Sequence, residues 1–210
     1  MAPGARCANI GAMADHDAWL VDLDGTLYHA VPVKFAMTWE LMIGGARVVQ
    51  VLRRFRQQHE VLRHEAPSGA NAYRIQLERA AAVSGMDVAA VERAVVEWMH
   101  VRPGKWISRF RRDSLLDEIR AFRSSGGRTA LVSDYPARQK LASLGASELF
   151  DVVIANGEPD GPSWIKPDPS GYLRAAERLG IAASRCLVIG DREDADGAAA
   201  RAAGMGFRRV

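Results

Sequence analysis

The 210-residue sequence has only two cysteines, Cys7 and Cys186, and only four lysines beside twenty-four arginines. Two cysteines in such different settings are too few for a disulfide framework, which favours a reducing compartment. No apolar run approaches the roughly eighteen residues of a membrane span. The first fourteen residues lack the apolar block of a signal peptide. We therefore expect a soluble, cytoplasmic protein in which residues 1–14 form a loose leader and either Met1 or Met13 is the start.

The excess of positive over negative charge is also small, because the formal net charge is only +3. The charges are nevertheless unevenly distributed along the chain. Fourteen basic and seven acidic residues lie between positions 31 and 112, so the rest of the chain is net negative. This asymmetry indicates two units with different roles. Arg53, Arg54 and Arg56 cluster, yet no nucleic-acid motif accompanies them. We expect a solvated helix face there rather than a nucleic-acid partner.

Four short apolar runs have the length and the β-branched content of buried strands. These runs are Ala18–Leu23, Thr129–Ser133, Val152–Ala155 and Cys186–Ile189. Apolar periodicity, early prolines and terminal glycines predict the helices Ser114–Ser124, Pro136–Leu144, Pro169–Leu179 with Asp168 as N-cap, and Asp194–Ala203. Phe207–Val210 leaves room for a short final strand. Buried strands alternating with helices predict an α/β fold with a parallel sheet, helices on both faces and a ligand site at the carboxyl ends of the strands.

Residues 31–106 break this alternation and show helical patterns only. The expected helices there are Ala46–His59, Asn71–Ala82 and Val88–His100, the last capped by Asp87. We therefore predict three parts: a leader at 1–14, a core formed by 15–30 and 107–210, and an all-helical insertion at 31–106 that follows the first strand.

Two of the expected strands end in residues suited to phosphate chemistry. Asp22 and Asp24 point to the same side of the first strand, where their mutual repulsion calls for a bound cation or a proton. A solvated turn is the alternative for such a pair taken alone. Ser133 and Asp134 end the second strand, where a hydroxyl and free amides can hold a phosphoryl oxygen.

Two further clusters complete the set. Lys166 is one of the four lysines, and its compact ammonium suits a phosphate beside a carboxylate. Asp191, Asp194 and Asp196 follow the fourth apolar run, and oxygen ligands at that density indicate a hard cation. A helix N-terminus enriched in acids explains Asp194 and Asp196 equally well, but it does not explain Asp191.

Together the four clusters resemble the motifs of the haloacid dehalogenase superfamily, phosphatase branch. Val21–Leu27 matches the first motif, Ser133 the second, Lys166 the third, and Gly190 with Asp191 the fourth. The resemblance covers the predicted core. It implies a three-layer, Rossmann-like core with a parallel sheet, and it makes the insertion a helical cap of the C1 type. Asp134 stands where relatives frequently have Asn.

The resemblance also implies an activity, the Mg²⁺-dependent hydrolysis of a small-metabolite phosphate monoester. Asp22 would attack phosphorus to form an aspartyl phosphate, and Asp24 would protonate the leaving oxygen and then activate water. Substrate binding would involve Ser133, Asp134 and Lys166. Lys166 would also be catalytic, because it would screen Asp22 from the substrate phosphate and stabilise charge in the transition state. Mg²⁺ would be held by the Asp22 carboxylate, the Asp24 backbone carbonyl and Asp191, with Asp196, or alternatively Asp194, in support.

Several alternatives remain open. A phosphomutase keeps all four motifs, and a catalytically silent binding module could share the scaffold. Dehalogenation and phosphonate hydrolysis are disfavoured because relatives that perform them lack the second aspartate. A dinucleotide-binding fold is disfavoured because no GxGxxG follows the first strand. The basic cap favours a substrate with a second anionic group. Either a monomer or a homodimer is expected. Five residues near the two expected hinges of the insertion either contact the leaving group or only cover the hinges: His29, Lys34, Arg102, Lys105 and Trp106.

Overall fold

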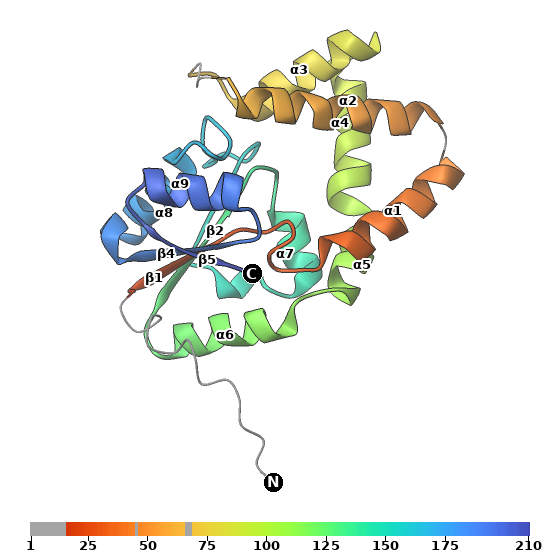
Figure 1. The fold of residues 1–210 in the computed structure, drawn as a ribbon. Helices are drawn as coiled ribbons and strands as arrows, with labels where there is room; N and C mark the ends of the chain where they lie inside the picture. The colour runs from red at the N-terminus through yellow and green to blue at the C-terminus, as the bar shows by residue number, and fades with distance from the viewer. Residues whose placement is uncertain (1–15, 45, 66–68) are drawn as a thin grey trace.

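A five-stranded parallel sheet forms the centre of the computed structural model, which describes residues 16–44, 46–65 and 69–210 (Figure 1). The strand order is β3-β2-β1-β4-β5. The strands are β1 Ala18–Val21, β2 Arg128–Ser133, β3 Val152–Ala155, β4 Cys186–Gly190 and β5 Gly206–Arg209. The predicted α/β fold with a parallel sheet is thereby confirmed. The expected leader and Cys7 lie outside the described residues.

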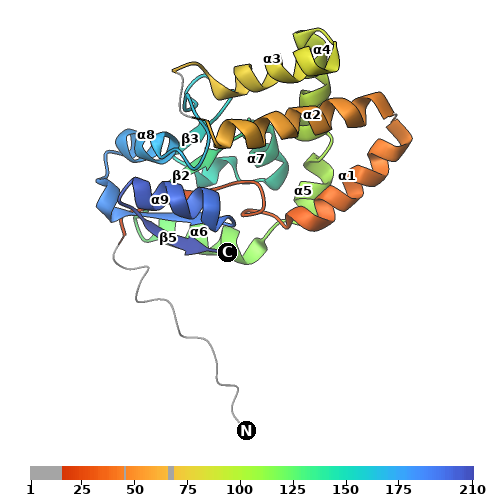
Figure 2. The same ribbon diagram turned by 45° about the horizontal axis from the view of Figure 1, so that its top comes forward.

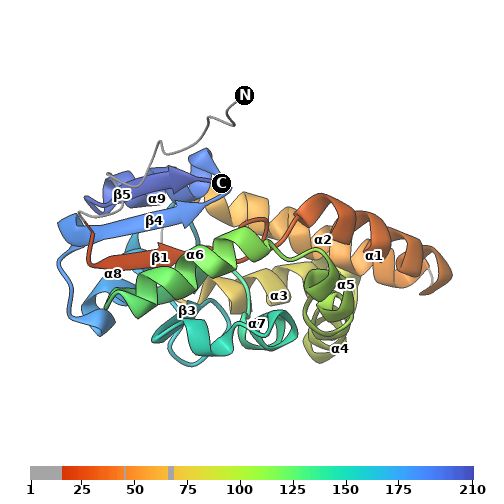
Figure 3. The same cartoon turned by 90° about the horizontal axis from the view of Figure 1, so that it is seen from below.

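Helices cover both faces of this sheet and make three layers, as Figure 3 shows for the face covered by α6. The helices α6 (Asp113–Ser124) and α7 (Arg138–Leu144) pack on one face, and α8 (Ser170–Leu179) and α9 (Ala198–Ala202) pack on the other. Alternation along β1 supplies both cores. Trp19 and Val21 join the first core, while Ala18 and Leu20 join the second. Burial on both faces explains why the strands are continuously apolar.

The ends of several predicted elements differ from those observed. The first strand ends at Val21 instead of Leu23, because the carbonyl of Leu23 accepts hydrogen bonds from the amides of Thr26 and Leu27 in a turn. The predicted Asp194–Ala203 helix is divided into a π-helical segment, Glu193–Gly197, and α9. The helices predicted to begin at Pro136 and Pro169 begin at Arg138 and Ser170. The N-cap position before α8 is Pro169 rather than Asp168, whose carboxylate accepts from the Ser170 amide.

Between β1 and α6 the described residues contain helices and no strand. The helices are α1 (Ala30–Gly44), α2 (Ala46–Arg63), α3 (Ala72–Ser84), α4 (Val88–Val95), a π-helical segment (Val96–Val101) and α5 (Gly104–Arg109). Asn71 and Asp87 cap α3 and α4 with their side chains. The sequence patterns did not indicate α1. Figure 2 shows these helices beside the sheet, toward the ends at which its strands finish.

The inserted helices α2 to α4 have a hydrophobic core of their own, centred on Phe55, Leu77 and Val95, which are almost fully buried. The helices α1 and α5 pack into the first core of the sheet domain. A smaller apolar cluster connects α2 to the sheet domain. In this cluster, Leu62 of α2 packs with Trp164 and Ile165. We refer to residues 30–109 as the cap. Among the described residues, none of the helices combines the length and the apolar character that crossing a membrane would need.

Candidate active site

The residues predicted to carry chemistry meet at the carboxyl ends of the strands. Asp22 and Asp24 follow β1, Ser133 ends β2, and Asp191 follows β4. Parallel strands finish at the same edge of a sheet, so these side chains converge. They surround a cavity of about 60 Å³ that is lined by Asp22, Asp24, Arg63, Ser133, Asp134, Tyr135, Lys166, Asp191, Arg192, Ala195 and Asp196. Of the predicted site residues, only Asp194 does not line it.

Asp22 and Lys166 form a buried ion pair at the centre of the site. The Lys166 Nζ lies 2.5 Å from Asp22 Oδ1 and 2.7 Å from Asp196 Oδ1. Thr26 donates a hydrogen bond of 2.8 Å to the other oxygen of Asp22, and Tyr172 donates one of 2.8 Å to Asp196. These bonds fix the orientation of the Asp22 carboxylate.

Burial and like charge make this group of carboxylates costly without a further cation. Burial raises the pKa of Asp22 well above its usual value, an effect that Lys166 offsets only in part and that Asp196 strengthens. Burial and the neighbouring Asp196 also raise the pKa of Asp191. Burial alone would lower the pKa of Lys166, but Asp196 and Asp22 raise it well above its ordinary range. Lys166 therefore stays charged, while the carboxylates favour additional positive charge.

Three of these carboxylates are close enough to share one ion. Single oxygens of Asp22, Asp191 and Asp196 lie within 4.8 Å of one another. Gly25 permits this approach, because its φ is 99° and a Cβ there would lie 2.2 Å from Asp191 Oδ2. A donor set made only of oxygen atoms fits Mg²⁺. Because Asp196 already accepts from Lys166 and Tyr172, its geometry suits support of the ion more than direct binding.

Asp24 lines the cavity, but its carboxylate is bound by a lysine that the sequence analysis did not single out. The Lys140 Nζ lies 2.6 and 2.7 Å from the two oxygens of Asp24, and Tyr28 donates a further hydrogen bond. Burial by itself would raise the pKa of Asp24, but Lys140 and Tyr28 lower it below its ordinary value. Lys140 and Tyr28 thus hold the carboxyl group of Asp24 in place at the edge of the cavity.

Asp134 connects the cap with the loop that carries Lys166. Its Oδ1 accepts a 2.9 Å hydrogen bond from the Lys166 amide, and its Oδ2 accepts a 3.1 Å bond from Arg63 of α2. His59 Nε2 lies 3.5 Å from the same oxygen. Although burial alone would raise the pKa of Asp134, Lys166, His59 and Arg63 hold it well below the usual range. The extra negative charge at this position is thereby balanced within the protein.

The remaining predicted residues differ in how they are placed. Ser133 is buried, and its Oγ accepts a hydrogen bond of 3.2 Å from the Tyr135 amide. Asp194 is exposed and pairs with Arg192 instead of facing the cavity. Its pKa is lowered by that hydrogen bond.

Two of the residues expected at the hinges hold α5 against α1 through the Glu40 carboxylate. Lys105 lies 2.8 Å from Glu40, and Trp106 donates a 2.7 Å hydrogen bond to the same carboxylate. Arg102 pairs with Glu97, and its guanidinium lies over the Trp98 ring. His29 and Lys34 do not line the cavity. This arrangement favours the structural alternative for these residues.

Sequence reasoning missed Lys140, Arg63, Tyr172 and Tyr28. For Lys140 a signal existed, because lysine is scarce in this chain and that scarcity was applied to Lys166 alone. Arg63 is one of twenty-four arginines, so the amino-acid composition of the chain does not single it out. Tyr172 falls on the apolar face of α8, where a tyrosine normally indicates core packing.

Residues 16–204 match the family described as haloacid dehalogenase-like hydrolase. A phosphoglycolate phosphatase of Colwellia psychrerythraea is 25% identical to this chain over 92% of the chain and 83% of the relative. The fructose-1-phosphate phosphatase YqaB of Escherichia coli is 42% identical over 71 residues, which are 33% of this chain and 35% of YqaB.

Among solved structures, a HAD phosphatase from Thermococcus onnurineus superposes with a TM-score of 0.62 at 20% identity. The superposition covers 92% of this chain and 86% of the other. At this identity the likeness shows the fold, and it agrees with the three layers described above.

Proposed function

The chain belongs to the haloacid dehalogenase-like hydrolase family, as its motifs led us to expect, and from that premise we propose that it hydrolyses small-metabolite phosphate monoesters with the help of Mg²⁺. The observation that carries the proposal is the buried pair of Asp22 and Lys166, set in one cavity with Ser133 and Asp191. A nucleophilic carboxylate beside a fixed ammonium, a hydroxyl and a further carboxylate is the equipment that phosphoryl transfer needs.

In the proposed reaction an oxygen of Asp22 attacks phosphorus, and the bond from phosphorus to the substrate's ester oxygen breaks. A proton delivered through Asp24 leaves with that oxygen as the alcohol. Water then attacks the aspartyl phosphate, Asp24 takes its proton, and inorganic phosphate is released while Asp22 is restored. Lys166 and Ser133 hold the phosphoryl oxygens throughout.

Asp22 and Asp191 would hold Mg²⁺, with the Asp24 carbonyl as the expected third protein ligand and Asp196 in support. When bound, the ion would supply positive charge between nucleophile and phosphate, which removes their repulsion. The carboxylate cluster fits this role because burial and repulsion by Asp196 raise the pKa values of Asp22 and Asp191.

We further propose a compact substrate that carries a second anionic group. The cavity is small, at about 60 Å³, and Arg63 brings a cap guanidinium to its wall. Arg53 and Arg56 line a different groove, so they do not extend this subsite. Phosphoglycolate, which a relative's name mentions, combines a short carbon chain with a carboxylate and is the first compound to test.

The direct experiment measures phosphate release from phosphoglycolate, sugar phosphates and nucleotides, with Mg²⁺ and with a chelator. Turnover should require Mg²⁺ and should fall roughly 1000-fold or more in Asp22→Asn, because the nucleophile is lost. Asp194→Asn is the matched control, since it changes an exposed aspartate of the same stretch and should retain activity.

Activity that persists with chelator or in Asp22→Asn would overturn the mechanism. A folded wild type that binds Mg²⁺ and releases no phosphate from any compound would overturn the phosphatase assignment. Conversion of a sugar phosphate to its isomer would instead identify a phosphomutase.

A further inference from the structure

Helix α1 is apolar on two opposite faces, and only one of them is covered. Val33 and Met37 are buried against the rest of the protein. The other face carries five large apolar side chains that are exposed by 68% to 82%: Val31, Phe35, Trp39, Met42 and Ile43. We refer to these five residues as the α1 stripe. They lie along one side of the helix because their spacing follows the helical repeat.

Such a stripe is unusual for a surface helix. A helix that is apolar all round is normally buried, and contiguous apolar patches on a soluble protein mark interaction sites. The charged residues of α1 are Lys34 and Glu40, and Glu40 is bound to Lys105 and Trp106. No charged side chain therefore interrupts the stripe.

We propose that the α1 stripe is the interface of a homodimer, in which the α1 helices of two copies pack antiparallel. The stripe is self-complementary under a two-fold axis. Its main row, Val31, Phe35, Trp39 and Ile43, repeats every four residues. Antiparallel pairing places Val31 against the partner's Ile43 and Phe35 against the partner's Trp39, and the same pairs recur on the other side. This is the isologous arrangement of closed dimers.

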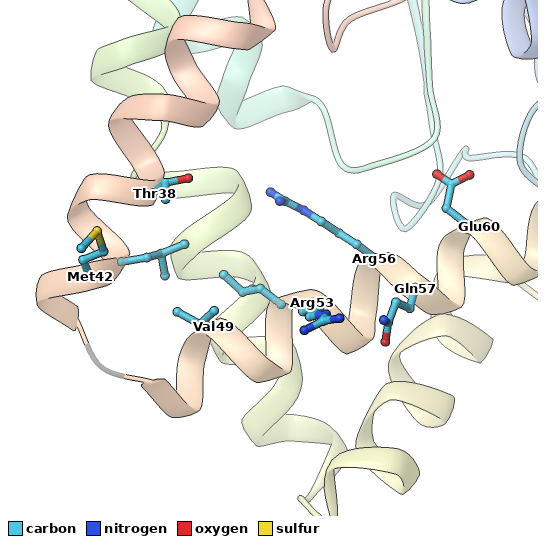
Figure 4. Close-up of a pocket in the computed structure, with 9 residues that line it drawn as sticks. Thr38, Met42, Val49, Arg53, Arg56, Gln57 and Glu60 are labelled. Carbon is cyan, nitrogen blue, oxygen red and sulfur yellow. The ribbon is translucent and has the colours of Figure 1, made fainter.

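The area is sufficient for a stable dimer. Side chains of these sizes, exposed to this degree, offer roughly 700 Å² per copy, or roughly 1400 Å² in total, which is within the range of specific interfaces. A groove of about 490 Å³ extends the apolar surface between α1 and α2 (Figure 4). Met42 and Val49 face each other across it, so it can receive side chains at the edge of the partner helix.

A second copy fits this surface better than the other occupants. Membrane-surface helices carry many lysines and arginines on their polar face, whereas α1 has one lysine. A copy of the same chain also presents a stripe of the same length and chemistry.

The test is sedimentation equilibrium of the full chain across about 1 to 100 μM. The wild type should approach twice the monomer mass of 22.9 kDa. The double variant F35E/W39E should remain a monomer, with dimer affinity lowered about 100-fold or more, because the two most exposed aromatic anchors become charged. Val83→Glu changes an exposed apolar residue of α3 and should dimerise as the wild type does.

Thermal unfolding followed by circular dichroism checks that both variants are folded, which is expected because the altered side chains are exposed. A wild type that stays monomeric at 100 μM would overturn the proposal, as would a dimer that survives F35E/W39E. Monomeric wild type that cosediments with phosphatidylcholine vesicles, while F35E/W39E does not, would assign the stripe to a lipid surface instead.

Discussion

Two of the four lysines, Lys140 and Lys166, are buried beside the carboxylates of the cavity. Each pairs with a different member of the first motif: Lys166 with Asp22, and Lys140 with Asp24. The two aspartates therefore differ in electrostatics although they are two residues apart. Burial raises the pKa of Asp22, while Lys140 overcomes the same effect and lowers that of Asp24. The proposed Mg²⁺ would act against the shift at Asp22, because a neighbouring cation lowers the pKa of a carboxyl group that must be ionised to attack phosphorus.

At the residue scale we predict that Lys140→Met lowers kcat roughly tenfold to 100-fold and leaves KM nearly unchanged. The reason is that Asp24 loses the partner that orients its carboxylate, while the groups that bind phosphate remain. Because breakdown of the aspartyl phosphate needs Asp24, acid-quenched samples should contain more phosphoenzyme than the wild type.

Lys140→Arg restores a cation and should recover part of kcat. Equal phosphoenzyme levels in wild type and Lys140→Met, with both proteins folded, would show that Lys140 does not position Asp24.

At the scale of elements, the turn after β1 decides the shape of the ion site. The chain leaves the strand at Asp22, and Gly25 has a φ of 99°. Residues that carry a Cβ rarely adopt this backbone conformation. The absence of a Cβ at Gly25 also leaves space for the Asp191 carboxylate that follows β4. One glycine thus permits both the turn and the approach of two strands' carboxylates.

We predict that Gly25→Ala weakens Mg²⁺ binding about tenfold or more, because its Cβ displaces Asp191 from Asp22. Isothermal titration calorimetry with Mg²⁺ measures this change. Gly126→Ala is the matched control: its φ is 94°, and a Cβ there meets no atom within 4 Å.

Both variants should lose similar stability from backbone strain, on the order of 1–3 kcal/mol. Only Gly25→Ala should lose affinity for Mg²⁺. Equal Mg²⁺ affinity in the two variants would contradict the role given to the space at Gly25.

On the scale of the whole molecule, the cap helices α2 to α4 have a core of their own, and a small apolar cluster joins α2 to the loop that carries Lys166. Leu62 of α2 is fully buried against Trp164 and Ile165, the two residues that directly precede Lys166 in the chain. Arg63, which follows Leu62 in α2, pairs with Asp134. The Asp134 carboxylate also accepts a hydrogen bond from the Lys166 amide. The position of the cap is thereby connected to the loop that carries Lys166.

We predict that Leu62→Ala costs about 2–5 kcal/mol of unfolding free energy and also lowers kcat/KM roughly tenfold. The cavity it leaves loosens the cap against the Lys166 loop. Hydrogen exchange should increase in α3 and in residues 163–168, with the central strands unchanged.

Leu77→Ala removes an equally buried leucine inside the cap core and serves as the control. It should reduce stability by a similar amount and leave exchange in residues 163–168 as in the wild type. If both variants changed that loop equally, the contact at Leu62 would not couple cap and site.

The sequence by itself determined the α/β class, the strand positions within about two residues and the edge of the sheet at which the candidate site residues converge. It could do so because buried parallel strands are locally apolar and their polar ends follow directly in the chain. Asp22, Ser133, Lys166 and Asp191 are such residues. Their convergence required only that the strands be parallel.

Only the tertiary structure decided which distant side chains meet them. The pairing of Lys140 with Asp24 joins residues 116 positions apart, and that of Arg63 with Asp134 joins residues 71 apart. The choice of Asp196 over Asp194 depends on a π-helical segment that turns one carboxylate inward and leaves the other exposed. Helix α1 is likewise a tertiary result: its apolar residues surround the helix, so no amphipathic period indicates which face is covered. Local patterns encode burial and strand ends, whereas contacts between elements depend on packing geometry that no short segment contains.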